Sequence, residues 1–176
     1  NLLSGSISPQ IGEMQNLESF DANSNQFRGL IPAEFAALPL LRILDLSGVP
    51  EAPGLTGQIP DDFGTFQSLE ELNLENNALT GAIKEQLGSL TLTRLRVGNN
   101  DFDMDDFPGF IYAMTSLVDL GMENCRLSGS IDPAIGDLVN LRILNLDANF
   151  LNGVLPEELG KLAALEELTM SFNTMN

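Results

Sequence analysis

The chain has 176 residues, of which 43% are hydrophobic and 19% are charged, a composition typical of one folded domain. Its formal charge of −17 argues against a nucleic acid or an anionic membrane surface as partner, because both would be repelled. It has no histidine and one cysteine, Cys125, which excludes Ser/His and Cys/His catalysis, CxxC redox chemistry and an internal disulfide.

One leucine-rich frame recurs along the chain. Two clear copies read LEELNLENNALTGAIKEQLGSL and LRILNLDANFLNGVLPEELGKL. A period of this length is the signature of stacked repeats, so we predict a single solenoid spanning residues 1–176. Its whole units begin at Leu17, Leu41, Leu69, Leu92, Leu117 and Leu141, with partial units at 1–16 and 165–176.

Each unit opens with alternating apolar and polar residues. Leu72 and Leu74, for example, alternate with Glu71, Asn73 and Glu75, which is the period of a strand with one buried face. A single unit cannot bury its own leucines. Stacked units can, by forming a parallel sheet over a shared core.

The second half of several units carries an apolar residue followed by proline. The prolines of these steps are Pro32, Pro60 and Pro156. Proline suits the first position of a helix, because the amide hydrogen that it lacks has no partner there. We therefore expect a short helical segment on the far side of the core from the sheet.

The frame LxxLxLxxNxLxGxIPxxLGxL resembles the plant-type leucine-rich repeat and covers essentially the whole chain. The resemblance implies an α/β fold, a right-handed solenoid with a parallel concave β-sheet and short helical or 3-10 convex segments. In receptor kinase ectodomains, receptor-like proteins and polygalacturonase-inhibiting proteins, similar repeats are ligand-binding scaffolds.

The resemblance also implies a function without catalysis, cofactor or metal. We expect a recognition module of an extracellular or cell-surface receptor-like protein that binds a peptide, protein or cell-wall glycan on its concave face. A co-receptor is a further expected partner, whereas nucleic acid and membrane contact are not expected. Two alternatives are a co-receptor or assembly module that binds a protein through its lateral edge, and a secreted inhibitor of a cell-wall-degrading enzyme.

An asparagine column follows the strands, at the point where each unit must turn. Its members are Asn25, Asn77, Asn100, Asn149 and Asn173. Buried amides can satisfy the backbone groups of such turns. Cys125 occupies the same position in its unit, where it is interpreted as a small buried substitute for asparagine.

Two units depart from the frame. The unit from Leu41 has four extra residues, with Pro50 and Pro53 expected to stiffen the bulge as a solvated loop or a partner contact. The unit from Leu92 reads NNDFDMDDFPGF. Its alternating aspartates suggest a calcium loop, but the glycine and glutamate that such a loop needs are missing. The favoured interpretation is that Asp105 or Asp106 caps the following short helix.

The outward columns of the strands form the candidate binding face, and two arginines stand out in it. Arg94 and Arg96 lie on one strand, with Glu71 and Asp119 predicted on the neighbouring strands. They are interpreted either as part of a charge ladder or as a fork that holds a carboxylate of the ligand, as an RxR pair does in some similar peptide-hormone receptors. The predicted ligand-binding residues are Arg94, Arg96, Glu71, Asn73, Glu75, Asp119, Glu123, Asn145 and Asp147.

Overall fold

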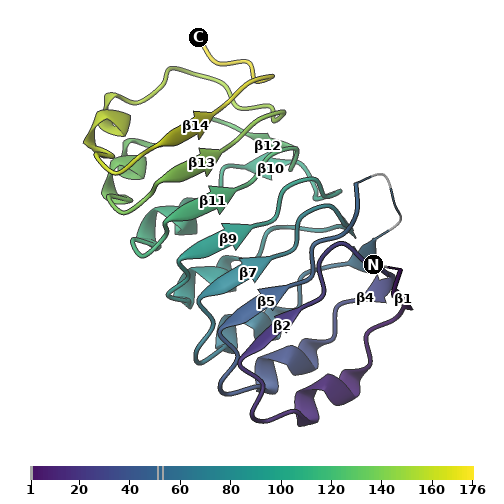
Figure 1. The fold of residues 1–176 in the computed structure, drawn as a ribbon. Coiled ribbons are helices and arrows are strands. Elements are labelled where there is room, and N and C mark those ends of the chain that lie inside the picture. Colours follow the sequence, from purple (N-terminus) through teal and green to yellow (C-terminus); the bar gives the residue numbers. More distant parts are fainter. Residues whose placement is uncertain (1, 51, 53) are drawn as a thin grey trace.

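The computed structural model describes residues 2–50, 52 and 54–176, so Asn1 and the predicted bulge residue Pro53 lie outside it. The described chain winds into stacked coils, with a curved parallel sheet on one side and short 3-10 helices on the other (Figure 1). This confirms the predicted solenoid. Each coil uses its alternating segment as a strand because only one face of that segment is apolar.

The main sheet has seven parallel strands among the described residues. In spatial order they are β2 (Ser19–Asp21), β5 (Ile43–Asp45), β7 (Glu71–Asn73), β9 (Arg94–Arg96), β11 (Asp119–Gly121), β13 (Ile143–Asn145) and β14 (Glu167–Thr169). Successive coils add neighbouring strands, and the register places equivalent repeat positions side by side.

Shorter strands run along one lateral edge. They form three groups: β1 (Ser4–Gly5) with β3 (Gln26–Phe27), then β4 (Gly29–Leu30), β6 (Leu55–Gly57) and β8 (Ala78–Leu79), then β10 (Asp105–Asp106) with β12 (Leu127–Ser128). The second group ends at β8 and the third begins at β10. The lateral ladder is therefore interrupted at the irregular unit that starts at Leu92.

The opposite side of the core is closed by 3-10 helices. They are η1 (Pro9–Glu13), η2 (Ala33–Ala37), η3 (Asp61–Thr65), η4 (Glu85–Ser89), η5 (Gly109–Ala113), η6 (Pro133–Asp137) and η7 (Glu157–Lys161). Phe35, Phe63, Leu87 and Ile135 are fully buried and pack against the strand leucines, whereas Leu159 is only partly buried. Burial of these apolar side chains is the main source of stability.

The expected positions of proline in the helices were partly wrong. Pro32, Pro60 and Pro156 occupy the cap position with extended backbone, one residue before the first helical residue. The first amides of a 3-10 helix have no intrahelical partner, so a proline at or just before the helix start costs no hydrogen bond. Proline therefore ends the extended connection here rather than beginning the helix.

The predicted asparagine ladder is confirmed. The side-chain nitrogen of Asn100 donates to the carbonyl oxygens of Leu74, Val97 and Gly98 at 3.0, 2.8 and 3.2 Å, and its oxygen accepts from the amide of Leu79 at 3.0 Å. One buried amide thus joins two coils through four bonds. Asn77 and Asn149 make the same kind of contacts.

Cys125 takes the asparagine position as predicted. Its Sγ lies 3.4 Å from the carbonyl oxygen of Val97 and 3.5 Å from that of Glu123, and its side chain is fully buried. Burial raises the pKa of the thiol, and the carboxylates of Glu123 and Glu75 raise it further. Such a thiol is unreactive, because the thiolate is the nucleophile.

The helix cap expected from Asp105 or Asp106 was wrong. Pro108 precedes η5 and has no side-chain capping bond, and the two aspartates form β10 instead. Asp106 Oδ1 accepts a hydrogen bond from Ser128 Oγ at 3.0 Å on the paired strand β12. Pairing between coils therefore outweighs the local capping tendency.

Candidate ligand-binding face

The outward residues of the main sheet form two aligned columns within the strands and a third just past the strand ends, which contains Asn23, Ser47, Glu75, Gly98, Glu123, Asp147 and Ser171. The first contains Ser19, Ile43, Glu71, Arg94, Asp119, Ile143 and Glu167. The second contains Asp21, Asp45, Asn73, Arg96, Gly121, Asn145 and Thr169. Parallel pairing in register brings these side chains together across the coils, as the repeat frame predicted.

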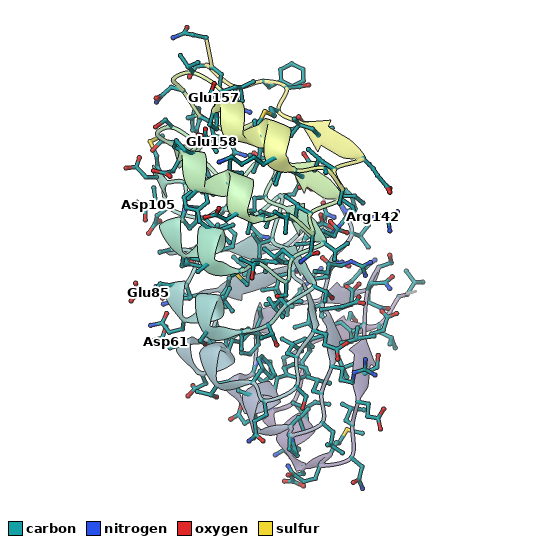
Figure 2. All side chains as sticks on the ribbon, turned by 90° about the vertical axis from the view of Figure 1, so that its left-hand side faces the viewer. Asp61, Glu85, Asp105, Arg142, Glu157 and Glu158 are labelled. Atoms are coloured by element: carbon teal, nitrogen blue, oxygen red, sulfur yellow. The ribbon has the colours of Figure 1, made fainter. Side chains whose placement is uncertain are left out.

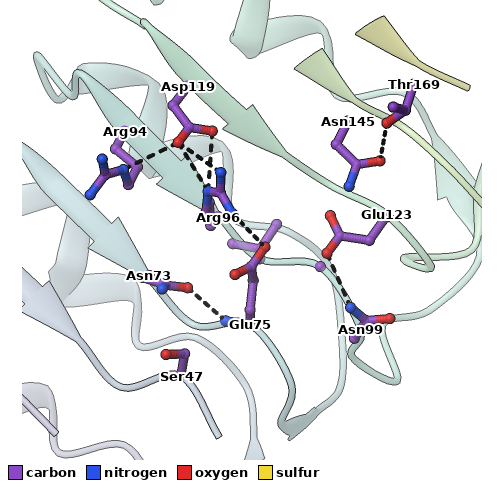
Figure 3. Close-up of polar contacts among 12 residues, drawn as sticks. Ser47, Asn73, Glu75, Arg94, Arg96, Asn99, Asp119, Glu123, Asn145 and Thr169 are labelled. Carbon is purple, nitrogen blue, oxygen red and sulfur yellow. Dashed lines mark hydrogen bonds and ion pairs between the residues drawn. The ribbon is translucent and has the colours of Figure 1, made fainter. Parts of the chain in front are cut away.

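Asp119 lies at the centre of a charge network on this face (Figure 3). Arg94 Nε donates to Asp119 Oδ2 at 3.2 Å, and Arg96 donates from Nη2 to the same oxygen at 2.9 Å. Arg94 also bonds Glu71 at 2.5 Å, and Arg96 pairs with Glu75 at 3.6 Å. Three carboxylates thus surround two guanidinium groups, as the predicted charge ladder requires.

Burial distinguishes the members of this network. The Asp119 side chain is 9% exposed and that of Glu75 is 13% exposed, whereas Arg94 retains 45% exposure. A carboxylate buried to this extent needs paired charges or hydrogen bonds to remain ionised. Arg94 is therefore the member of the network that is most accessible to a ligand.

The carboxyl group of Glu123 lies close to that of Glu75, beside Gly121. A methyl group at Gly121 would lie 3.2 Å from Glu75 Oε1 and 3.4 Å from Glu123 Oε2. Burial and the neighbouring charge of Glu123 raise the pKa of Glu75 to about 7, although Arg96 opposes the shift. Protonated Glu75 can donate to Glu123, whose buried Oε2 has no hydrogen-bond partner within the described residues.

Glycine makes this arrangement possible. A Cβ at Gly98 would lie 2.3 Å from Cδ of Glu123, so the glutamate side chain occupies the space that a side chain at position 98 would need. Glu123 Oε1 also accepts from Asn99 Nδ2 at 3.0 Å. Neither Gly98 nor Asn99 was among the predicted site residues. A missing side chain in an outward column, followed by an asparagine, was the available signal.

The remaining predicted residues make polar contacts with their neighbours along the same face. Asn73 Nδ2 donates to Asp45 Oδ2 at 3.0 Å. Asn145 Oδ1 accepts from Thr169 Oγ1 at 2.7 Å (Figure 3). Asp147 Oδ1 accepts from the backbone amide of Ser171 at 2.5 Å. The nine predicted residues thus lie on one face, but Asn145 and Asp147 bond toward β14 and not toward the arginines.

A family model described as Leucine Rich Repeat matches residues 16–38, 68–90 and 140–162. Each matched stretch covers one coil, from its main-sheet strand to its convex 3-10 helix, the parts that carry the shared core. The chain thus carries leucine-rich repeats, and its fold is a leucine-rich repeat solenoid.

Its relatives are plant receptors. This leucine-rich repeat chain is 34% identical over 145 residues to Receptor-like protein 39 of Arabidopsis thaliana. The aligned region covers 82% of this chain and 13% of the relative. It is 29% identical over 176 residues to Receptor-like protein 41 of the same plant, covering 98% of the chain and 17% of that relative.

Solved structures agree. The leucine-rich repeat ectodomain of the Arabidopsis receptor kinase HAESA, in complex with an N-terminally extended IDA peptide hormone, has a TM-score of 0.93 and 34% identity. The match covers 99% of this chain and 29% of HAESA. This chain therefore shares its fold with the HAESA ectodomain, and it spans less than a third of the length of each of these proteins. None of the helices among the described residues is long and apolar enough to cross a membrane.

Proposed function

We propose that this chain is a non-catalytic recognition module in the extracellular part of a receptor-like protein, and that it binds a peptide or protein on its concave face. The observation that carries the proposal is the polar, aligned face of seven strands. A solenoid buries its apolar residues between coils, so this face is left for a partner. The HAESA complex and that of GASSHO1/SCHENGEN3 with CASPARIAN STRIP INTEGRITY FACTOR 2 support a peptide as ligand.

The charge of the face favours a basic ligand. Apart from the two arginines, its charged residues in the outward columns are Asp21, Asp45, Glu71, Glu75, Asp119, Glu123, Asp147 and Glu167. The formal charge of −17 adds a long-range field that raises the association rate of a cation. We infer that specificity lies in the acidic strands on either side of β9.

The arginine pair has two possible roles, and its contacts favour one. A ligand carboxylate bound by Arg94 and Arg96 would have to compete with Asp119, which already bonds both. The contacts therefore support the charge ladder, in which the pair relieves repulsion among acids. The exposed guanidinium of Arg94 remains the best contact point for an acidic group of a ligand.

Peptide pools of defined net charge, immobilised on a sensor surface, test this proposal. The parent protein should bind basic pools more tightly than acidic ones, and the Arg94→Glu/Arg96→Glu variant should alter binding at least about tenfold, since it reverses two charges at the centre of the face. A gain for basic pools would support the charge ladder, and a loss for acidic pools would support a carboxylate anchor.

The matched control is Arg42→Glu/Arg142→Glu. These arginines also pair with glutamates, Glu70 and Glu166, but they lie before the strands and not in their outward columns. Thermal melting of all variants separates a binding defect from a folding defect. The concave-face proposal is wrong if both double variants change binding equally, or if neither changes it.

One feature favours the alternative role as an assembly module. A pocket with apolar inner walls and an acidic rim opens on the lateral edge beside η5, away from the concave columns.

A further inference from the structure

A cavity of about 270 Å³ opens where the lateral ladder is interrupted. Strand β10 pairs forward with β12, and the ladder behind it ends at β8. The unit from Leu92 carries DFDMDDF where its neighbours have a short step to glycine. The amide of Asp103 still donates to the carbonyl oxygen of Gly81 on the preceding coil at 2.9 Å, but β10, which follows it, pairs with β12 and not with β8. The cavity is thus a consequence of the sequence irregularity.

The inner walls of the cavity are apolar. They include Phe102, Phe107 and Leu127, which are almost completely buried, together with the partly buried Ile83 and Phe110. A ligand group that displaces water from these walls gains hydrophobic free energy. Aromatic rings also attract a cation placed over their faces.

The rim is acidic. Glu85, Asp103, Asp105 and Asp106 line the opening and are all exposed. Glu85 and Asp105 lie on the same side as Asp61, Glu157 and Glu158, along the edge of the convex helices (Figure 2).

The cationic side chains Lys84 and Arg126, near this rim, already bond other residues. Lys84 Nζ bonds Asp61 at 2.9 Å and Gln58 at 3.0 Å on the preceding coil. Arg126 pairs with Asp101 at 3.3 Å. A cation supplied by a partner would therefore meet an unbalanced negative rim.

We propose that this pocket is a second binding site, which accepts a lysine or arginine side chain of a protein partner. Such a side chain has an apolar stem and a charged head, matching apolar inner walls and an acidic rim. A purely apolar group would desolvate the carboxylates without pairing them, and an acidic group would be repelled. The site lies outside the concave columns, so it is independent of the proposed concave-face function.

The probe is a capped peptide, acetyl-Leu-Arg-Leu-amide, titrated into the ¹⁵N-labelled protein and followed by NMR. We expect saturable shifts of the backbone amides of residues 83–85 and 102–110, which weaken as salt is added. Acetyl-Leu-Glu-Leu-amide and acetyl-Leu-Leu-Leu-amide should produce no saturable shifts there. Equal shifts with either of these two peptides would refute the charge selectivity and hence the site.

Gly109→Leu tests the location. Gly109 lines the pocket, and a Cβ there meets no atom within 4 Å, so a leucine at this position adds apolar bulk to the pocket lining without a clash. We expect at least a tenfold weaker affinity for the arginine peptide. Gly160→Leu is the matched control, because Gly160 is equally open but does not line the pocket. Unchanged binding by Gly109→Leu would overturn the proposal.

Rim charges are tested with Glu85→Gln/Asp103→Asn, which neutralises two carboxylates of the opening. Its control is Glu157→Gln/Glu158→Gln in the first turn of η7, outside the pocket. We expect the first variant to lose affinity several-fold and the control to retain the parental affinity. Shifts confined to the strands β7 and β9 would refute the pocket and leave the concave-face proposal standing.

Discussion

Arg96 donates from Nε and Nη2 to the carboxylate of Asp119 on the adjacent strand, at 3.1 and 2.9 Å. The acceptor is buried and the donor is half-buried, so the pair is partly shielded from water. Shielding strengthens the attraction and also raises the cost of losing either partner.

Asp119→Ala should therefore destabilise the protein by about 1–3 kcal/mol, because it leaves Arg94 and Arg96 without their shared acceptor. Urea unfolding followed by circular dichroism measures the free energy of unfolding. The comparison is Glu166→Ala, which breaks an exposed pair with Arg142 and should cost about 0–1 kcal/mol. Equal costs would show that the network does not stabilise the sheet.

The asparagine ladder predicts a larger effect. Asn100→Ala removes four hydrogen bonds, so that the buried amide of Leu79 loses its side-chain acceptor and the carbonyl oxygens of Leu74, Val97 and Gly98 each lose one donor. We expect a loss of roughly 2–4 kcal/mol, since each unsatisfied buried group is costly. The measurement is again urea unfolding, with the exposed Asn140→Ala as control because its amide makes one bond, to the carbonyl of Thr115. A loss no larger than that of the control would contradict the structural role of the ladder.

Glu75 makes stability depend on pH. Burial first, and repulsion by Glu123 and Asp119, raise the pKa of Glu75 to about 7 from its ordinary value near 4.5, while Arg96 lowers it. The folded protein thus binds more protons than the unfolded chain between these values, so the free energy of unfolding should fall as pH rises from about 4.5 to 7.

Glu75→Gln should flatten this decline, because its side chain is neutral at every pH. Glu123→Gln should also flatten it, by removing the nearest negative charge. The expected difference from the parent above pH 7 is on the order of 1–3 kcal/mol. Melting temperatures across pH 4–8 measure it, with Thr169→Val as a control that changes no ionisable group. Parental pH dependence in both glutamine variants would rule out this pair as its origin.

Much of the fold could be predicted because strand and repeat periods agree. Leu72 and Leu74 alternate with polar residues, and the same alternation recurs in every unit, which fixes both the buried face and the register. The position of Glu71 and Asp119 beside Arg94 followed from that register. The burial of Cys125 at the asparagine position could be predicted from the same alignment of the units.

Other features depend on space that a sequence does not specify. The approach of Glu123 to Glu75 requires the room left by Gly98 and Gly121, two residues without side chains. The lateral pocket arises because β10 pairs with β12, whereas local preference placed Asp105 or Asp106 at a helix cap. These are contacts between coils, and residue types alone do not rank them against local alternatives.

The four-residue insertion provides the last prediction, at Gly48. A Cβ there would lie 2.1 Å from the backbone oxygen of Asn76 on the next coil, a contact that neither backbone can avoid without moving. Gly48→Ala should cost about 2 kcal/mol or more, because overpacking against backbone cannot be relieved by a side-chain rotation. Gly109→Ala is the control, since its Cβ meets no atom within 4 Å. Equal unfolding midpoints in urea would show that the inserted segment does not pack against the following coil.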